Sequence, residues 1–409
     1  MRRLTAPLPR CALVLGLLLT PVGCAEPEKD KVTIMVPWSG TEFKAFYAVV
    51  KDFERDHDID IEPQVTRALT QQLDAAVAAD AEPDLAVLPS VGAIAKYRQA
   101  GALSKLDVDT HAYVQPLRGL GMNGKDVYAV PVKADIKSLV WYDARLTARP
   151  PGSWSTLRDR SDHWCLGLES GPTSGWPGAD WIADILLADE GVGPYTAWAS
   201  GEGRWDKGPV KAAWTEWGDL VAGARKGAAT FNFRAATEKM AKAGCSLSHG
   251  ALSAMAFDSA QVKTDGYTYV PSSRGALQVS ADFVGKFTGN RSADEFIKYL
   301  ASPRAQRTWV NEPGFALSAD NRVTAYDNAT QGRIAAMLRS SRYTLCFSAA
   351  DAMDPDVSAA FYRAVLNYTD GKDLTPLLVA LTRVQRELGY THPGSPPPPG
   401  PLCSPPNHP

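Results

Sequence analysis

The chain has 409 residues, which is more than one ordinary domain needs, so we expect two lobes or two domains. Hydrophobic residues make up 45% and charged residues 22%, as in a globular protein with a packed core. A formal net charge of -2 and the lack of a basic block argue against nucleic acid as a partner.

Residues 1–24 predict a secretory signal peptide. Arginines precede an apolar run over residues 11–19, and the segment ends at Pro21-Val22-Gly23-Cys24. This ending resembles the lipobox of bacterial lipoproteins, whose cysteine becomes the lipidated first residue, although Pro21 stands in place of the usual leucine. We expect Cys24 to anchor a soluble body to the outer face of the cell membrane. Simple secretion and an uncleaved anchor are the alternatives.

Three strand and helix units follow the signal. Short apolar runs predict the strands, and apolar residues three and four apart predict the helices. We expect strands over 32–36, 59–65 and 84–88, and helices over 43–53, 69–79 and 91–100. This order implies a parallel sheet with right-handed crossovers. Trp38 and Glu42 follow the first strand, so we expect them at the sheet edge where such folds bind ligands; for Glu42, helix capping is the alternative.

The next segment contains a turn and a candidate hinge. A glycine-rich run at residues 119–124 has dinucleotide-binding spacing, but a strand-like run follows it where a helix is needed, so we predict a turn and no cofactor. The extended residues 130–135 then lead to a second strand at 138–142, and we expect Asp135 to point into a cleft between two sheets. A satisfied surface acid is the alternative for Asp135.

Residues 164–187 gather aromatic rings, carboxylates and a cysteine. A polar turn leads past Trp176 into a helical run over 180–187. Sugars suit such a surface, because their C–H faces stack on rings while their hydroxyls need hydrogen-bond partners. We expect Thr173, Ser174 and Trp176 to bind the ligand, and burial of the tryptophan rings in the core is the alternative.

Export of the chain leaves four cysteines in an oxidising compartment. We expect Cys165 and Cys245 to form a disulfide, since each lies beside a turn-rich segment; two buried free thiols are the alternative. No C-x-x-C motif occurs and the six histidines are scattered, so we predict no metal site.

The second half of the chain has mainly helical spacing. Strands are expected over 267–271 and 278–283, and helices over 293–300, 303–309, 330–338 and 357–388. Asp351 and Tyr362 cluster near a helix start, from which they could bring a carboxylate and a ring to the cleft. His249 is either a hydrogen-bonded structural residue or a ligand contact. The proline-rich residues 391–409 predict an extended tail that does not pack.

Common catalytic motifs are missing from the sequence. It contains no G-x-S-x-G, no H-E-x-x-H and no Gly-Lys followed by Ser or Thr. Carboxylates could still pair for glycoside cleavage, so a secreted glycoside-active enzyme stays open. The candidates for such a pair are Glu42, Asp135, Glu169, Asp180 and Asp351.

Six segments, in order along nearly the whole chain after the signal, resemble the extracellular solute-binding proteins of ABC importers, of the carbohydrate-binding family 1 kind. They are residues 32–42, EPDLAVLPSVGAIAKYRQAGALSKLD (82–107), VPVKADIKSLVWYD (130–143), SGPTSGWPGADW (170–181), FIKYLASPRAQRTWV (296–310) and GFALSA (314–319). The likeness is greatest to actinobacterial members that resemble α-glucoside or oligosaccharide binders.

The resemblance implies an α/β, two-lobed fold of the type II periplasmic-binding-protein kind, whose hinged lobes close over a ligand in the cleft between them. It implies lobe 1 over 31–136 plus 268–318 and lobe 2 over 137–267 plus 319–390. It also implies that Asp135, Asp282, Asp351 and Tyr362 reach the ligand and that Cys346 is a free thiol.

We therefore expect a lipid-anchored protein that binds a carbohydrate, delivers it to the membrane-embedded permease subunits of an ABC importer, and has no chemistry of its own. A binding protein for a non-sugar solute is a further alternative.

Overall fold

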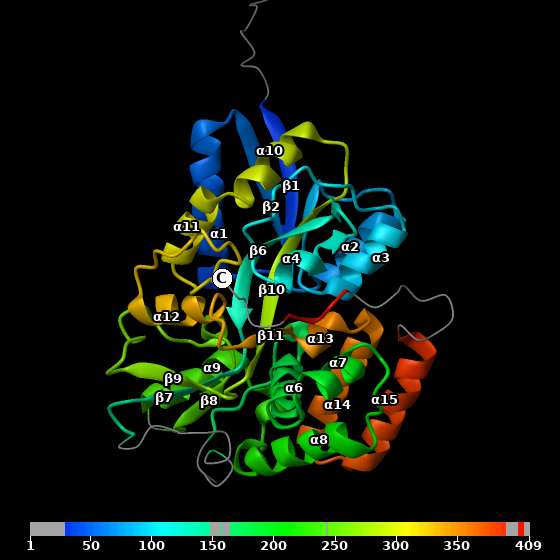
Figure 1. Ribbon diagram of the computed structural model, residues 1–409, viewed down its shortest axis with the longest axis vertical. Helices are drawn as coiled ribbons and strands as arrows, with labels where there is room; N and C mark the ends of the chain where they lie inside the picture. Colours follow the sequence, from blue (N-terminus) through cyan, green and yellow to red (C-terminus); the bar gives the residue numbers. More distant parts are fainter. Residues whose placement is uncertain (1–28, 148–156, 158–163, 243, 390–399, 405–409) are drawn as a thin grey trace, which may run out of the picture.

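The computed structural model describes residues 29–147, 157, 164–242, 244–389 and 400–404. The predicted signal peptide and Cys24 lie outside the described residues, as does most of the proline-rich segment. The chain forms two α/β lobes, with a large mixed sheet in the first and a small antiparallel sheet in the second (Figure 1). Among the described residues, no helix combines the length and apolar character needed to cross a bilayer.

The three predicted βα units build the first lobe. Strand β1 pairs in parallel with both β2 and β3, as the order of the units predicts. The strands are β1 (Asp30–Val36), β2 (Ile59–Val65) and β3 (Leu85–Leu88), and the helices are α1 (Gly40–Asp56), α2 (Leu69–Ala78) and α3 (Val91–Gln99). Two later helices, α10 (Arg291–Leu300) and α11 (Pro303–Asn311), complete this lobe (Figure 1). Phe46, Val50 and Phe53 of α1 are fully buried, because their spacing places them on one face of the helix.

The glycine-rich run at 119–124 is a turn, as predicted. It follows the short helix α4 (Leu117–Leu120) and contributes to the hairpin of β4 (Met122–Asn123) and β5 (Asp126–Val127). A Cβ on Gly121 would lie 2.1 Å from the Ala129 carbonyl oxygen, so the close approach of the next strand requires a glycine here.

Two long strands connect the lobes. Strand β6 (Ala129–Ile136) pairs antiparallel with β10 (Ala276–Lys286). At one end β10 also pairs with β3, and at the other end it pairs in parallel with β11 (Thr344–Phe347). The chain passes directly from β6 into β7 (Leu139–Asp143) of the small sheet, so the hinge predicted near residue 136 coincides with a change of sheet.

The second lobe packs helices around the sheet β8-β7-β9. The other strands of this sheet are β8 (Leu247–His249) and β9 (Tyr267–Pro271). Its helices are α6 (Trp176–Glu190), α7 (Val192–Ala199), α8 (Gly208–Leu220), α9 (Phe233–Glu238), α12 (Ala329–Met337), α13 (Ala349–Ala352), α14 (Pro355–Thr369) and α15 (Leu374–Leu388). Short 3-10 helices cover Gly171–Thr173, Ala222–Ala224, Ala228–Thr230, Lys239–Lys242 and Leu252–Ala254. Trp214 and Trp217 are fully buried and belong to an aromatic core with Phe361.

Two disulfides are present among the described residues. Cys165 bonds to Cys245, as predicted. The prediction of a free thiol at Cys346 is wrong, because Cys346 bonds to Cys403. The expectation of a tail that does not pack is also wrong for residues 400–404, since β12 (Cys403–Ser404) pairs with β11 and the Leu402 side chain is buried.

Candidate functional site

Three carboxylates surround the ammonium group of Lys133 on β6. Lys133 Nζ lies 2.8 Å from Glu42, 3.5 Å from Asp135 and 3.8 Å from Asp282. Trp38 donates a hydrogen bond from its indole nitrogen to Asp282 over 2.9 Å. Four predicted ligand contacts, Trp38, Glu42, Asp135 and Asp282, thus lie together, around a lysine that the sequence analysis did not select. We call these five residues the Lys133 cluster.

Burial controls the ionisation of this cluster. It raises the pKa values of Asp135 and Asp282, because the charged carboxylate loses hydration, although Lys133 opposes the shift. Burial acts in the same direction on Glu42, but Lys133, together with Arg234 and Arg67, outweighs it, so the pKa of Glu42 is lowered. The three neighbouring acids raise the pKa of Lys133 despite its burial. The lysine therefore stays charged and holds the acids together.

A second cluster surrounds Lys137, four residues further along. Lys137 Nζ lies 2.8 Å from Asp180 of α6 and 2.8 Å from Asp351 of α13. Ser348 contributes its hydroxyl 3.3 Å from the same nitrogen, and the ring of Trp176 lies 5.8 Å from it. An extended chain directs every second side chain to the same face, and Lys133, Asp135 and Lys137 follow one another at intervals of two residues. We call Lys137 with Asp180, Ser348 and Asp351 the Lys137 cluster.

The pKa of Asp180 is raised to about 6, mainly by burial, with Lys137 opposing the shift. The acids beside Lys137 raise its pKa, although burial acts against this. At neutral pH the cluster therefore combines one cation with carboxylates that accept hydrogen bonds.

Trp176 forms an aromatic wall beside the Lys137 cluster. It is partly exposed at the start of α6, and its ring meets the edge of Phe233 with centroids 5.1 Å apart. Gly175 precedes it at a φ of 104°, and a Cβ there would lie 2.3 Å from the carbonyl oxygen of Tyr362. Only glycine allows this contact, which fixes Trp176 against α14. Burial raises the pKa of Tyr362, and the nearby Asp351 and Asp180 raise it further.

Thr173 and Ser174 hydrogen-bond within their own turn. Thr173 donates to the Ser170 carbonyl over 3.1 Å, and Ser174 donates to the Gly171 carbonyl over 2.6 Å. Their hydroxyls shape the turn before Trp176, and their contact with a ligand stays a prediction.

His249 lies behind this site and not on its surface, which favours its structural interpretation. Its side chain is 1% exposed, and Nε2 is 2.7 Å from Asp184. Asp184 also accepts hydrogen bonds from Ser138 and Ser272. The imidazole stacks on Trp181, which is itself buried, so both rings belong to the interior of the second lobe.

Two narrow cavities adjoin the clusters. Trp38, Glu42, Lys133 and Trp309 line the first. The second lies beside Trp176, Phe233 and His249 and has a volume of about 30 Å³. Binding pockets for small molecules typically enclose about 300–1,000 Å³. The second cavity is therefore too small for a solute of sugar size.

A hydrogen bond joins the two lobes beside the Lys133 cluster. Ser253, which precedes β9, donates to Asp135 of β6 over 2.6 Å. Arg234 of α9 also acts electrostatically on Glu42 of α1. Within the described ranges, no group of three or more His, Cys, Asp or Glu side chains is arranged to hold a metal ion.

Comparison with known proteins places this geometry in a family. The family model described as bacterial extracellular solute-binding protein matches residues 37–307, which is more than half of the chain. The chain belongs to this family. Extracellular solute binding without catalysis is therefore its general function, and the glycoside-active enzyme considered from the sequence is ruled out.

Individual solute-binding proteins share most of their length with this one. The alpha-glucosides-binding periplasmic protein AglE of Rhizobium meliloti is 26% identical over 83% of this chain and 84% of its own. The osmoprotective compounds-binding protein GgtB of Synechocystis sp. is 24% identical over 88% of this chain and 93% of its own. The solved structure of the bacterial solute receptor AcbH has a TM-score of 0.74 at 14% identity, over 88% of this chain and 98% of its own, so it shares the fold.

Sequence reasoning missed the two lysines at the centre of this solute-binding protein's clusters. The sequence marked 130–135 as a hinge with a lone lysine, yet it did not show that Lys133, Asp135 and Lys137 share one face. The alternation of residues along an extended chain was the available signal. The partners of these residues come from distant elements, and no local pattern could identify Ser253, Phe233 or Ser348.

Proposed function

We propose that this protein binds a carbohydrate, with an oligosaccharide the favoured size, between the Lys133 cluster and the Lys137 cluster. The observation that carries this proposal is the partly exposed Trp176 ring beside acids that are held in place by buried lysines. The acids accept hydrogen bonds from sugar hydroxyls, and the lysines both orient the acids and donate to ring or hydroxyl oxygens. The Trp176 face stacks on the C–H face of a sugar ring.

The proposed contacts are Trp38, Glu42, Asp135 and Asp282 on the first wall, and Asp351, Tyr362, Thr173, Ser174 and Trp176 on the second. We add Lys133, Lys137 and Asp180 to this set, because they form ion pairs with each other or with the proposed contacts Glu42 and Asp351. His249 acts through Trp181 and supports the second wall.

The lobe boundaries are also a proposal. They follow the sequence expectation near residues 136 and 318. The expected boundary at 267 moves to residues 272–275, because β9 (Tyr267–Pro271) pairs with β7 in the second lobe and β10 begins at Ala276. The change of sheet between β6 and β7, and the length of β10, support them. The lobes separate to admit the sugar, and its contacts with both walls favour the closed arrangement, which signals occupancy to the permease.

Export and anchoring complete the proposal. The signal-like residues 1–24 direct the chain outside the cell, and a lipid on Cys24 holds it at the outer face of the membrane. There the protein delivers its solute to the permease subunits of an ABC importer. The printed function of AglE, binding of alpha-glucosides, supports α-glucosides as the first ligands to test.

A thermal-shift screen of the chain lacking residues 1–24 tests this function. The panel contains α-glucosides, other mono- and oligosaccharides, and small osmoprotective solutes, since GgtB is named for the latter. We expect at least one sugar to raise the melting temperature, because it binds the folded state alone, and to be recovered unchanged. Stabilisation by non-sugar solutes alone would reject the carbohydrate proposal.

A further inference from the structure

Residues 400–404 form a strap across the strand that leads into the proposed site. Cys403 bonds to Cys346 of β11, and the neighbouring Ser404 pairs with Leu345. The Phe347 amide donates to the Leu402 carbonyl over 2.7 Å, and the Leu402 side chain is 3% exposed. The strap thus contacts β11 through a covalent bond, backbone hydrogen bonds and an apolar side chain.

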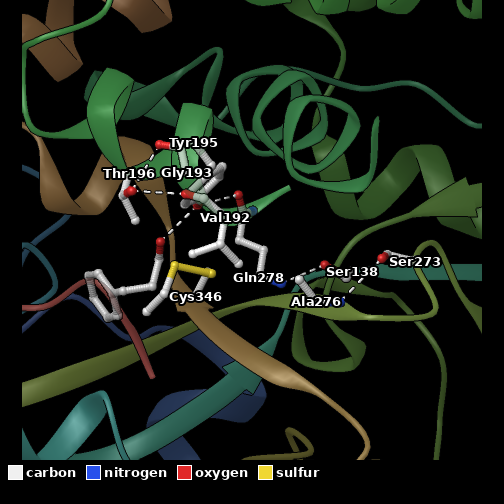
Figure 2. Close-up of a disulfide and its surroundings, with 11 residues drawn as sticks. Ser138, Val192, Gly193, Tyr195, Thr196, Ser273, Ala276, Gln278 and Cys346 are labelled. Carbon is white, nitrogen blue, oxygen red and sulfur yellow. Dashed lines mark hydrogen bonds between the residues drawn. A yellow bond between two sulfur atoms is a disulfide. The ribbon is translucent and has the colours of Figure 1, made fainter. Parts of the chain in front are cut away.

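Strand β11 would be an edge strand without the strap. On its other side it pairs with β10, where Cys346 lies opposite Gln278 (Figure 2). It has four residues, so it makes few ladder hydrogen bonds of its own. A short edge strand opens easily, because the N–H and C=O groups on its free side bond to water and not to a neighbouring strand.

The residues that follow β11 enter the Lys137 cluster directly. Ser348 lies two residues after Cys346, and its hydroxyl contacts both Lys137, over 3.3 Å, and Asp180, over 3.1 Å. The same hydroxyl accepts from the Asp351 amide at the start of α13, over 3.4 Å. Asp351 in turn pairs with Lys137.

A buried hydrogen-bond network continues from the disulfide to α6. The Tyr195 hydroxyl lies 2.7 Å from the Phe347 carbonyl oxygen and 3.1 Å from Gln278 Oε1 (Figure 2). Gln278 Nε2 donates to the backbone carbonyl of Asp180 over 3.3 Å. A shift of β11 would therefore disturb Asp180 through its backbone as well as through Ser348.

We infer that residues 400–404, tied down by the Cys346–Cys403 disulfide, are positioning residues for the ligand site, because they hold Ser348 and Asp351 against Lys137. They act through β11 and α13. This inference rests on the proposed site, and one of the measurements below does not depend on a ligand.

Two variants release the strap in different ways. The double variant C346A/C403A removes the covalent bond, and Leu402→Asp places a charge in the buried docking position. Phe53→Leu is the control for general destabilisation, since Phe53 is buried against Phe296 and Tyr299 at the far end of the first lobe.

Calorimetric titration with the sugar found in the screen measures the effect on binding. We expect both strap variants to bind about tenfold more weakly, as for one charge-assisted hydrogen bond lost from the site. Phe53→Leu lowers the melting temperature and keeps the wild-type affinity. In an Asp351→Asn background the strap variants reduce the affinity for the sugar by a smaller factor than in the wild type, because the residue through which they act is already altered.

Hydrogen exchange provides the ligand-independent measurement. The amides of Ala352 and Met353, which bond to the Ser348 and Ala349 carbonyls, exchange faster in both strap variants and at the wild-type rate in Phe53→Leu. Unchanged exchange at these amides, or unchanged affinity in both strap variants, would overturn the inference. If the wild-type protein binds no sugar, the proposed function fails, and exchange alone then decides whether the strap orders α13.

Discussion

Trp176 differs from its neighbours in the central stretch because part of its ring is exposed. Trp164 and Trp181 are buried and pack against each other, and Trp181 also stacks on His249. The sequence predicted a ligand-binding role for Trp176 but did not distinguish it from core tryptophans. The spacing of tryptophans along a helix does not show whether a ring binds a ligand or packs in the core. The difference comes from Gly175, which turns the chain so that Trp176 begins α6 at the surface.

Replacing Trp176 with alanine is expected to weaken sugar binding by about tenfold to a hundredfold, the value of one stacked aromatic face. Trp214→Phe is the matched control, because Trp214 is fully buried against Phe361 and Tyr368, so a smaller ring there lowers stability without changing a proposed contact residue. Calorimetric titration of both variants tests this. Equal losses of affinity would indicate that packing, and not stacking, explains the effect.

Asp180 gives sugar binding a pH dependence. Its pKa is raised to about 6 by burial, so it is mostly charged at pH 7.5 and mostly neutral at pH 5. Protonation removes an acceptor for sugar hydroxyls and weakens the ion pair with Lys137. We expect the affinity for the sugar to have its highest value above about pH 7 and to fall as the pH decreases through about 6.

Titrations at pH 5, 6 and 7.5 measure this dependence, with Asp180→Asn as the control. The variant should bind more weakly at pH 7.5 and lose the step near pH 6. Persistence of the full step in Asp180→Asn would assign it to another group, such as Asp135 or Asp282.

At the level of elements, local periodicity predicted most helices and strands. The three βα units, β9, β10 and the helices α10 to α12 lie close to their predicted positions. Residues 164–168 form no regular strand, and Trp164 makes an isolated bridge with Leu247. The expected helix over 357–388 is two helices, α14 and α15, with Gly371 at a φ of 93° between them.

Long-range pairings were harder to predict than elements. The Cys165–Cys245 disulfide was predicted from its turn-rich surroundings, whereas the resemblance to the family implied a free thiol at Cys346, which is bonded to Cys403. Composition suggested that a proline-rich segment could not pack. Leu402 and Cys403 pack nonetheless, because a disulfide and a buried leucine need only a few ordered residues.

Removal of the Cys165–Cys245 disulfide is expected to reduce stability. The two cysteines are 80 residues apart, and closing such a loop constrains the unfolded chain by about 4 kcal/mol in the chain-entropy model. The C165A/C245A variant should therefore have a lower free energy of unfolding by about 2–5 kcal/mol. Urea denaturation measures this difference, and an unchanged midpoint and slope would contradict it.

For the whole molecule, the main consequence of the fold is that it brings proposed contact residues of the two lobes close together. Ser253 of the second lobe donates a hydrogen bond to Asp135 of the first, beside the Lys133 cluster. Because this bond joins the two lobes beside the proposed site, we expect lobe motion to accompany entry of a solute.

Lobe motion predicts a change of shape with ligand. Small-angle X-ray scattering should show a smaller radius of gyration when the sugar identified in the screen is present, because the solute favours the closed arrangement. Trp176→Ala should need more sugar to reach the same change. A radius that is independent of sugar at saturating concentration would contradict hinge closure.

The crystal structure of the protein with its sugar tests the central claim most directly, since it locates the solute. We predict a sugar ring stacked on Trp176, with hydroxyls within hydrogen-bond distance of carboxylates in both the Lys133 cluster and the Lys137 cluster. A sugar bound outside the space between these clusters, or making no contact with Trp176 and either group of acids, would contradict the account.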